Sequence, residues 1–176
     1  MTETIRTATT HDAGKLAELA AVTFPLACPP GASPADIQTH VETHLGESNF
    51  NGYLTDANIT VLVLEKAGEL AGYTMLVAKP ASDPDVASVL SATPSAELSK
   101  CYVHPDHHGQ GVASRLMRAS LAVAADKGAA GVWLGVNSEN AKAIRFYEKS
   151  GFQRVGTKSF TLGRAVEHDF VMETEL

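Results

Sequence analysis

Apolar residues recur along the chain with two different spacings, which predict its secondary structure. Alternation with a period of two and short β-branched runs predict strands, whereas apolar residues three or four apart predict helices. The expected strands cover residues 5–9, 59–65, 70–79, 97–103, 131–136, 152–162 and 166–173. The expected helices cover residues 13–23, 34–45, 112–127 and 137–150. Prolines are expected to exclude regular structure from residues 24–32. Residues 49–58 form a polar stretch, and the composition of residues 80–94 predicts a loop or a short helix.

The stretch from Glu97 to Met117 changes period from two to three or four, which predicts a strand, a loop and the start of a helix. The first N–H groups of a helix lack partners within the helix, and its dipole places about half a positive charge there. Gly109 and Gly111 would let a large anion such as a pyrophosphate approach the backbone of this loop. The same glycines fit a turn that requires positive φ, so the spacing alone leaves both interpretations open.

The order of the expected elements predicts an α/β fold with a mixed sheet covered by helices. Strands and helices alternate in most of the chain, and the last two strands follow each other as a hairpin. The glycine loop then lies at the C-terminal end of a central strand, where open α/β sheets bind ligands.

Composition limits the class of protein. With 176 residues and 44% hydrophobic content, the chain is expected to form a single domain over residues 1–176. A net charge of −6 and a pI near 5.6 argue against nucleic-acid binding, which needs a basic face. No apolar run approaches the roughly 18 residues of a membrane span, and the N-terminus lacks the pattern of a signal peptide. Cys28 and Cys101 are therefore expected to be reduced thiols in a cytoplasmic protein.

Two blocks of residues resemble the GNAT superfamily of acyl-CoA-dependent N-acetyltransferases. The block from His108 to Ala113 is similar to its R/Q-x-x-G-x-G/A loop, which binds the pyrophosphate of coenzyme A. The block from Asn140 to Phe152 is similar to its N-x-x-A-x-x-F/Y-Y-x-x-x-G-F signature. The resemblance implies acetyl-CoA as the cofactor. It also implies a mostly antiparallel sheet with a splayed central pair of parallel strands, flanked by helices.

By this resemblance, the pantetheine arm of acetyl-CoA lies between the strand that ends at Val103 and the strand at residues 131–136. Main-chain groups of Cys101 and Val103 would hold the arm, and one of their N–H groups would polarise the thioester carbonyl. Asn140 matches a position whose side chain commonly contacts the cofactor. The loop residues implied to bind the cofactor are His108, Gly109, Gln110, Gly111, Val112, Ala113 and Ser114. His108 stands where the superfamily usually has Arg or Gln, so the resemblance supports the backbone cradle more than a contact of this side chain.

Two residues are candidates for proton transfer. Tyr147 matches the position that commonly protonates the leaving thiolate in this superfamily, although a core aromatic would fit the same helix face. Glu97 precedes the loop at a spacing similar to that of the general-base glutamate in some members. The alternatives are a solvated glutamate at the start of a strand and a base formed by a chain of waters. Strand alternation predicts one shared face, unless a bulge interrupts it, for Glu97, Ser99, Cys101 and Val103.

The histidines near the loop do not predict a metal site. His104, His107 and His108 lie within five residues, a spacing that seldom closes a tetrahedral site. We therefore expect no metal. Cys101 lies in mid-strand without an evident base, so we expect a small buried side chain and not a nucleophile.

The C-terminal half carries a narrower resemblance, to bacterial polyamine N-acetyltransferases. It rests on a Trp-Leu-Gly-Val run at residues 133–136, a Phe-x-Leu-Gly run at residues 160–163, Asp169 and Met172. These are mostly packing positions, so they indicate ancestry better than substrate. We expect the acceptor to be a primary amine of a small molecule, with a polyamine as one candidate. The alternatives are a protein or peptide N-terminal acetyltransferase, an antibiotic-amine acetyltransferase and a non-catalytic acyl-CoA sensor.

The acceptor is expected to bind near residues 22–36, residues 80–94 and the hairpin loop at Arg164. Phe24 and Leu26 offer apolar contacts, and the proline loop has few carboxylates, which argues against a polyamine. The carboxylates that could still serve a polyamine are Asp36, Glu42, Glu47, Asp83 and Asp85. The resemblance also allows a homodimer.

Overall fold

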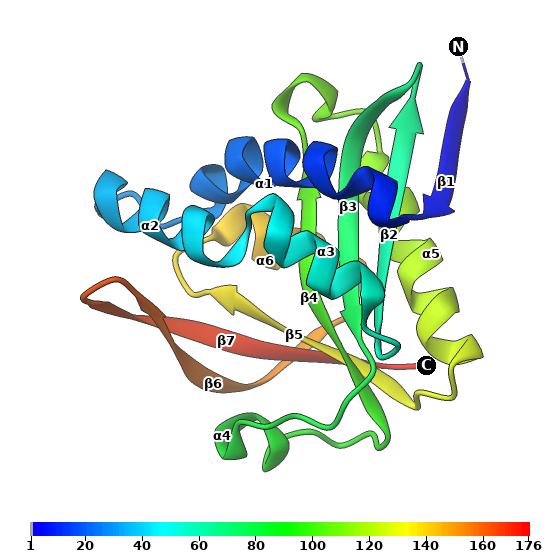
Figure 1. Ribbon diagram of the computed structural model, residues 1–176. Coiled ribbons are helices and arrows are strands. Elements are labelled where there is room, and N and C mark those ends of the chain that lie inside the picture. The colour runs from blue at the N-terminus through cyan, green and yellow to red at the C-terminus, as the bar shows by residue number, and fades with distance from the viewer. Residues whose placement is uncertain (1) are drawn as a thin grey trace.

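The computed structural model describes residues 2–176, which form one seven-stranded sheet with helices on both faces (Figure 1). The strand order is β1-β2-β3-β4-β5-β7-β6, in which β4 and β5 are parallel and the other neighbours are antiparallel. The strands are β1 (Glu3–Thr7), β2 (Ile59–Lys66), β3 (Glu69–Val77), β4 (Ser95–Val103), β5 (Gly131–Asn137), β6 (Gln153–Leu162) and β7 (Ala165–Glu175). The α helices are α1 (Ala13–Ala27), α2 (Pro34–His44), α3 (Glu47–Thr55), α4 (Pro84–Ala87), α5 (Val112–Asp126) and α6 (Ala141–Lys149). The predicted mixed sheet with a central parallel pair and flanking helices is confirmed.

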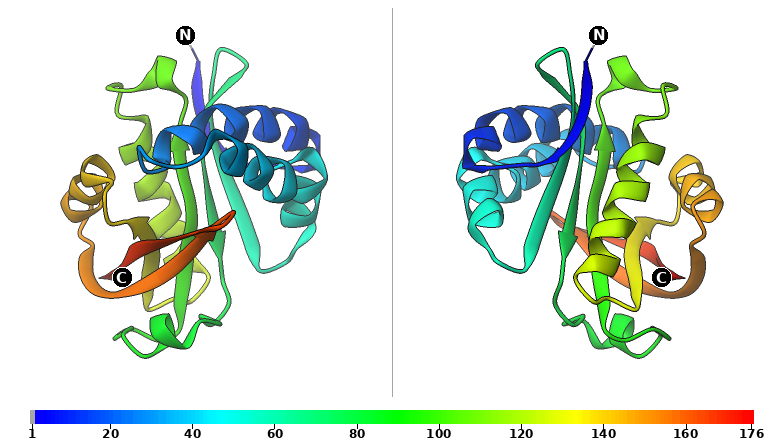
Figure 2. Two further views of the ribbon diagram at one scale, coloured as in Figure 1. Left: turned by 90° about the vertical axis from the view of Figure 1, so that its left-hand side faces the viewer. Right: turned by 90° about the vertical axis from the view of Figure 1, so that its right-hand side faces the viewer.

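The helices cover both faces of the sheet. Figure 2 shows α1, α2 and α3 on one face, and α5 and α6 on the other. Successive side chains of a strand point to opposite faces, so a central strand needs apolar residues in an unbroken run. In β2, Val61 and Val63 pack with residues of α1 and α3, whereas Leu62 and Leu64 pack with residues of α5. The β-branched and apolar run at residues 59–65 therefore lies between two helical layers.

Strands β4 and β5 are paired only at their beginnings. Residues 95–97 of β4 pair with residues 131–133 of β5, and the two strands then part. Beyond this point β4 continues along β3 to Val103, whereas β5 continues along β7 to Asn137. A gap therefore opens between the C-terminal halves of the two central strands, as the family resemblance implied.

A β-bulge at Ser99 changes which residues of β4 share a face. Met75 of β3 pairs with Lys100, and its neighbour Leu76 pairs with Leu98, so Ser99 is an extra residue in β4. Leu98 and Cys101 consequently lie in one apolar cluster with residues of α5. The prediction of a shared face for residues 97, 99, 101 and 103 is wrong, because the bulge shifts the alternation by one residue.

Helix α1 continues beyond the point where prolines were expected to end it. The prediction that residues 24–32 lack regular structure is wrong for residues 24–27, because α1 ends at Ala27 with Pro25 inside it. Proline lacks an N–H group, so Pro25 removes one helix hydrogen bond, but only two residues follow it before the helix ends. The extension brings the last turn of α1 to the site described below.

Helix α3 was not predicted and lies largely within the polar stretch at residues 49–58. At its start, the side chain of Asn49 accepts a hydrogen bond from the backbone N–H of Gly46 at 3.0 Å. Phe50 is fully buried, and Tyr53 and Leu54 pack against the same core. These three residues have the helical spacing i, i+3, i+4, so the signal was present but short.

The longest helices of residues 2–176 are α1 and α5, with 15 residues each. No helix in this part of the chain is long and apolar enough to cross a membrane.

Candidate functional site

The loop between β4 and α5 has the backbone conformation that its glycines suggested. Gly109 and Gly111 have φ values of +78° and +74°, which residues with a Cβ atom rarely adopt. Gly111 caps the N-terminus of α5, and the N–H of Arg115 donates to the Gly111 carbonyl at 3.1 Å. The N–H groups of Val112, Ala113 and Ser114 precede this bond and have no partner within the helix. The loop therefore combines an open backbone with free donors at the positive end of a helix.

Several side chains of this loop form hydrogen bonds within the protein. The Nε2 of His108 donates to the Val103 carbonyl at 2.9 Å, so this ring folds back onto the end of β4. The side-chain oxygen of Gln110 accepts from Lys66 Nζ at 2.9 Å. Arg115, which the motifs did not single out, donates to the Gln110 carbonyl at 3.0 Å and to Glu3 at 2.6 Å. These bonds fix the shape of the loop and tie it to β1 and β2.

A cavity of about 340 Å³, here called the loop cavity, lies beside this loop. Its walls are the last turn of α1, the end of β4, the glycine loop, the first turn of α5 and one face of α6. The predicted cofactor residues that line it are Cys101, Val103, His108, Gly109, Gly111, Val112, Ala113, Ser114 and Asn140. Gln110 does not line it.

A second cavity, of about 520 Å³, lies on the other side of the gap between β4 and β5 and is here called the charged cavity. It is lined by the end of α1, by α2 and Tyr53, by β4 from Glu97 to Tyr102, and by β5, β6 and Asp169. The two cavities meet at a shared set of residues. These are Ala27, Cys101, Tyr102, Asn140, Ala143 and Tyr147. A molecule in one cavity can therefore approach a molecule in the other at the point where β4 and β5 part.

Four charged side chains line the charged cavity. Lys158 Nζ lies 3.8 Å from Asp169 Oδ2, and both side chains are mostly buried. Glu97 and Lys100 lie on β4 on either side of the bulge at Ser99. Burial raises the pKa of Glu97, and the charges of Lys158 and Lys100 lower it by less. Burial also raises the pKa of Asp169 and lowers that of Lys100. Sequence reasoning gave no role to Lys100 or Lys158, although a lysine within a central strand was a usable signal.

Aromatic rings form part of the wall of the charged cavity. The His40 ring stacks on Phe24 with centroids 4.5 Å apart and meets the Phe160 ring edge-on at 5.6 Å. Burial lowers the pKa of His40, and so do the nearby His44 and Lys100. A neutral His40 ring therefore adds to an aromatic surface at this end of the cavity.

Three polar residues at the junction of the two cavities are half-buried, namely Cys101 of β4, Asn140 and Tyr147 of α6. Burial raises the pKa of Tyr147 well above 10, so its hydroxyl keeps its proton at neutral pH. Burial also raises the pKa of the Cys101 thiol to about 12, which agrees with the expectation that this thiol is not a nucleophile. Asn140 caps the N-terminus of α6, where its side-chain oxygen accepts from the Ala143 N–H at 3.2 Å.

The charged cavity contains only part of the residues that were expected near the acceptor, namely Phe24, Ala27, Cys28 and Pro29 of residues 22–36. Residues 80–94 and Arg164 do not line the charged cavity. Residues 80–83 line a smaller neighbouring cavity of about 320 Å³, which shares Glu97 and Lys158 with the charged cavity. Two elements that were not expected near the acceptor also line the charged cavity. These are the C-terminal part of α2 and Tyr53 of α3, a helix that was not predicted.

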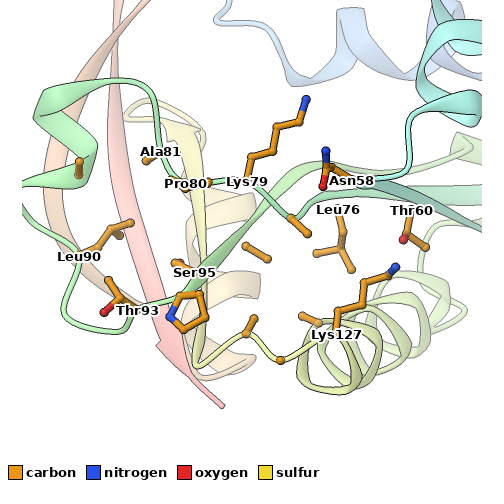
Figure 3. Close-up of a pocket in the computed structure, with 17 residues that line it drawn as sticks. Asn58, Thr60, Leu76, Lys79, Pro80, Ala81, Leu90, Thr93, Ser95 and Lys127 are labelled. Carbon is orange, nitrogen blue, oxygen red and sulfur yellow. The ribbon is translucent and has the colours of Figure 1, made fainter.

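A further cavity of about 320 Å³, here called the distal cavity, lies at the opposite end of β4 (Figure 3). Its walls are formed by residues 78–81, residues 93–96 and the C-terminal end of α5, with Lys79 and Lys127 beside mostly apolar side chains. It shares no lining residue with the loop cavity or the charged cavity in the described part of the chain. Within residues 2–176, no group of three or more His, Cys, Asp or Glu side chains is arranged to hold a metal ion.

Comparisons with known proteins agree with this geometry. The model of the acetyltransferase (GNAT) family matches residues 21–152. A Mycobacterium tuberculosis protein, named as an uncharacterized N-acetyltransferase, is 46% identical over 165 residues, which cover 94% of this chain and 98% of that protein. The L-amino acid N-acyltransferase MnaT of Escherichia coli is 30% identical over 140 residues, which cover 72% of this chain and 80% of the relative.

A solved structure shares the whole fold. The paia N-acetyltransferase of Thermoplasma acidophilum, crystallised in complex with coenzyme A, matches with a TM-score of 0.80 and 19% sequence identity. The match covers 100% of both chains. Together with the family model, which spans the glycine loop and the Asn140 block, these findings show that the chain belongs to the GNAT family of N-acetyltransferases.

Proposed function

We propose that the protein transfers the acetyl group of acetyl-CoA directly to a primary amine of a small molecule while both are bound. The observation that carries this proposal is the meeting of the loop cavity and the charged cavity at Cys101, Tyr102 and Tyr147. A thioester that reaches this junction from one side is accessible to an amine from the other. Holding both reactants in this way replaces a bimolecular encounter with a step inside one complex.

Acetyl-CoA is the cofactor of the GNAT family, and the loop cavity fits it. Gly109 and Gly111 leave the loop backbone open, and the first N–H groups of α5 suit a pyrophosphate. The parted edge of β4 offers main-chain groups of Cys101 and Val103 for the pantetheine arm. When bound, acetyl-CoA would supply the thioester that carries the acetyl group.

Individual residues of the loop cavity would contribute unequally. Because the Asn140 oxygen caps α6, its amide N–H₂ is the part available to the cofactor. The ring of His108 already donates to the Val103 carbonyl, so His108 would shape the loop more than bind phosphate. Gln110 does not line the loop cavity, and its side chain accepts a hydrogen bond from Lys66, so at most its backbone would contact the cofactor.

Glu97 is the proposed general base. An amine that is protonated in water must lose a proton before it attacks a carbonyl carbon. Glu97 lines the charged cavity, and among residues 2–176 its carboxylate has no hydrogen-bond donor and no cation within 4.0 Å. Its raised pKa brings it nearer to neutral pH, where a carboxylate is a better proton acceptor.

Tyr147 is the proposed general acid. It lies on α6 at the junction, and its raised pKa keeps its hydroxyl protonated. A thiolate that leaves the acetyl group needs a proton, which this hydroxyl could donate if it lies within hydrogen-bond reach of the sulfur. The ring also packs edge-on against Phe152 at 6.0 Å between centroids, so the residue has a structural role as well.

The names of relatives point to different acceptors, so the family does not identify the amine. The Escherichia coli relative is named for L-amino acids, and the sequence also resembles polyamine acetyltransferases. A polyamine stays a prediction, but Lys100 in the charged cavity weighs against it, because its ammonium group has no carboxylate within 4.0 Å in the described part of the chain and would repel a polycation. A cytoplasmic location and a homodimer also stay predictions, which cell fractionation and light scattering would check.

The test is an acetyl-transfer assay on the purified protein with acetyl-CoA. Polyamines, aminoglycosides, amino acids and peptides serve as acceptors, free CoA is measured with a thiol reagent, and mass spectrometry identifies acetylated products. We expect CoA release that depends on the presence of an amine. Tight binding of CoA without turnover on any amine would contradict the proposal and favour a non-catalytic sensor.

A further inference from the structure

The charged groups of the charged cavity are not all paired with one another. Lys158 and Asp169 lie 3.8 Å apart and neutralise each other. Their pairing is supported by Gly135 of β5, where a Cβ atom would lie 2.6 Å from Lys158 Cε and 3.4 Å from Asp169 Oδ2. This leaves Glu97 and Lys100 as the two charges of the cavity without a direct partner.

The ammonium group of Lys100 is not paired with a carboxylate of the described residues. Among residues 2–176 it has no carboxylate within 4.0 Å and no hydrogen-bond acceptor, and Lys100 Nζ lies 5.5 Å from the centroid of the Tyr53 ring. Burial lowers its pKa, which the charge of Glu97 only partly offsets. A desolvated cation of this kind gains most from an anion that binds beside it.

The bulge at Ser99 brings Lys100 and Glu97 to the same cavity. Without the bulge, residues 97 and 100 would point to opposite faces of β4, because their separation is odd. With it, both line the charged cavity, about 7 to 10 Å apart along the strand. Long side chains from these two points can reach a basic and an acidic group on one small molecule.

We infer that the acceptor is an α-amino acid, with its amine at Glu97 and its carboxylate bound by Lys100. This inference rests on the proposed function and names the substrate class. A polyamine would have to place positive charge near Lys100, which is unfavourable in a poorly solvated cavity. The rings of Phe24, His40 and Phe160 line the same cavity and favour an apolar or aromatic side chain on the amino acid.

Matched acceptors test the need for a carboxylate. The twenty common L-amino acids are compared with their C-terminal amides and with the corresponding decarboxylated amines, and spermidine is included. A charge-assisted hydrogen bond contributes about 1.5 to 3 kcal/mol, so kcat/KM for the best amino acid is expected to exceed that of its amide and its amine by about 10- to 100-fold. A preference for the amide, the amine or spermidine would overturn the inference.

Substitution of Lys100 tests the residue. Lys100→Met is expected to raise KM for the best amino acid about tenfold or more and to lower the ratio of kcat/KM for that amino acid to kcat/KM for its decarboxylated amine by a similar factor. The ratio is the readout because loss of the Lys100 charge also changes the pKa of Glu97, which affects both acceptors alike. Lys100→Arg should restore part of the preference, because it keeps the charge. Lys127→Met, beside the distal cavity, is the control and should keep the wild-type preference. Equal losses for the acid and the amine in Lys100→Met would overturn the assignment.

The two levels of the proposal fail in different ways. If no acceptor releases CoA although CoA binds, the proposed acetyltransferase function fails. If decarboxylated amines or spermidine are acetylated faster than amino acids, the function stands and the substrate class is wrong.

Discussion

Replacing Gly111 by Ala would test the proposed phosphate-binding loop. Gly111 has a φ of +74°, and an added Cβ atom would lie 3.0 Å from Arg115 Nη1, the end of the side chain that braces the loop. Left-handed backbone costs a residue with a Cβ about 1–2 kcal/mol, which is the expected loss of stability. Displacing one backbone N–H from an anion costs a further 1.5 to 3 kcal/mol or so of binding energy, so we expect CoA to bind about 10- to 100-fold more weakly.

Gly128→Ala is a matched control for this experiment. Gly128 follows the other end of α5 with a φ of +90°, and a Cβ there would meet no atom within 4 Å. The strain of positive φ is therefore similar, but the loop is untouched. Urea unfolding should give similar losses of stability for both variants, whereas calorimetric titration with CoA should show weaker binding for Gly111→Ala alone. If both variants weaken CoA binding equally, or if a folded Gly111→Ala protein binds CoA as tightly as the wild type, the loop does not bind the pyrophosphate as proposed.

Three further predictions concern titratable groups. The Arg6 guanidinium lies 2.8 Å from Asp12 and lowers the pKa of that carboxyl from 3.8 to about 2. This shift contributes about 2 kcal/mol to the free energy of unfolding above pH 4, and the contribution is lost as the pH falls towards 2. Asp12→Asn should lose this stability at pH 7 and little at pH 2, measured by urea unfolding. Glu97→Gln should lower kcat about 100-fold or more, and it should abolish the rise of kcat/KM with pH that deprotonation of Glu97 causes. A pH profile equal to that of the wild type would exclude Glu97 as the base. Tyr147→Phe should lower kcat about 100-fold with KM for acetyl-CoA unchanged, and full turnover would remove it from the mechanism.

The predictable part of the fold was the part with long, regular patterns. The seven strands along the chain and the helices that cover their sheet followed from runs such as residues 59–65 and the stripe of α5. Short signals were missed, as with α3, whose apolar stripe has only Phe50, Tyr53 and Leu54. A general rule also failed at Pro25, because proline is tolerated where few helix hydrogen bonds remain to be broken.

The proposed cofactor side of the site was more predictable than the proposed acceptor side. Gly109 and Gly111 are local signals, since a short loop between a strand and a helix needs their conformations wherever it occurs. The charged cavity instead collects residues distant in sequence, such as His40, Lys100, Lys158 and Asp169. No local pattern links these positions, so their proximity follows only from the packing of α2, β4 and the β6–β7 hairpin.

The bulge at Ser99 connects the two sides, and the sequence does carry its signature. Ala96 and Leu98 are two residues apart, as in a regular strand, but the next residue of the same apolar layer, Cys101, is three further on. In a regular strand Lys100 would join Leu98 under α5, where burial of an unpaired ammonium group is very costly. The extra residue avoids this cost, and it places Lys100 with Glu97 in the charged cavity while Cys101 reaches the junction. One inserted residue thus separates the groups proposed to bind the acceptor from those proposed to hold the cofactor.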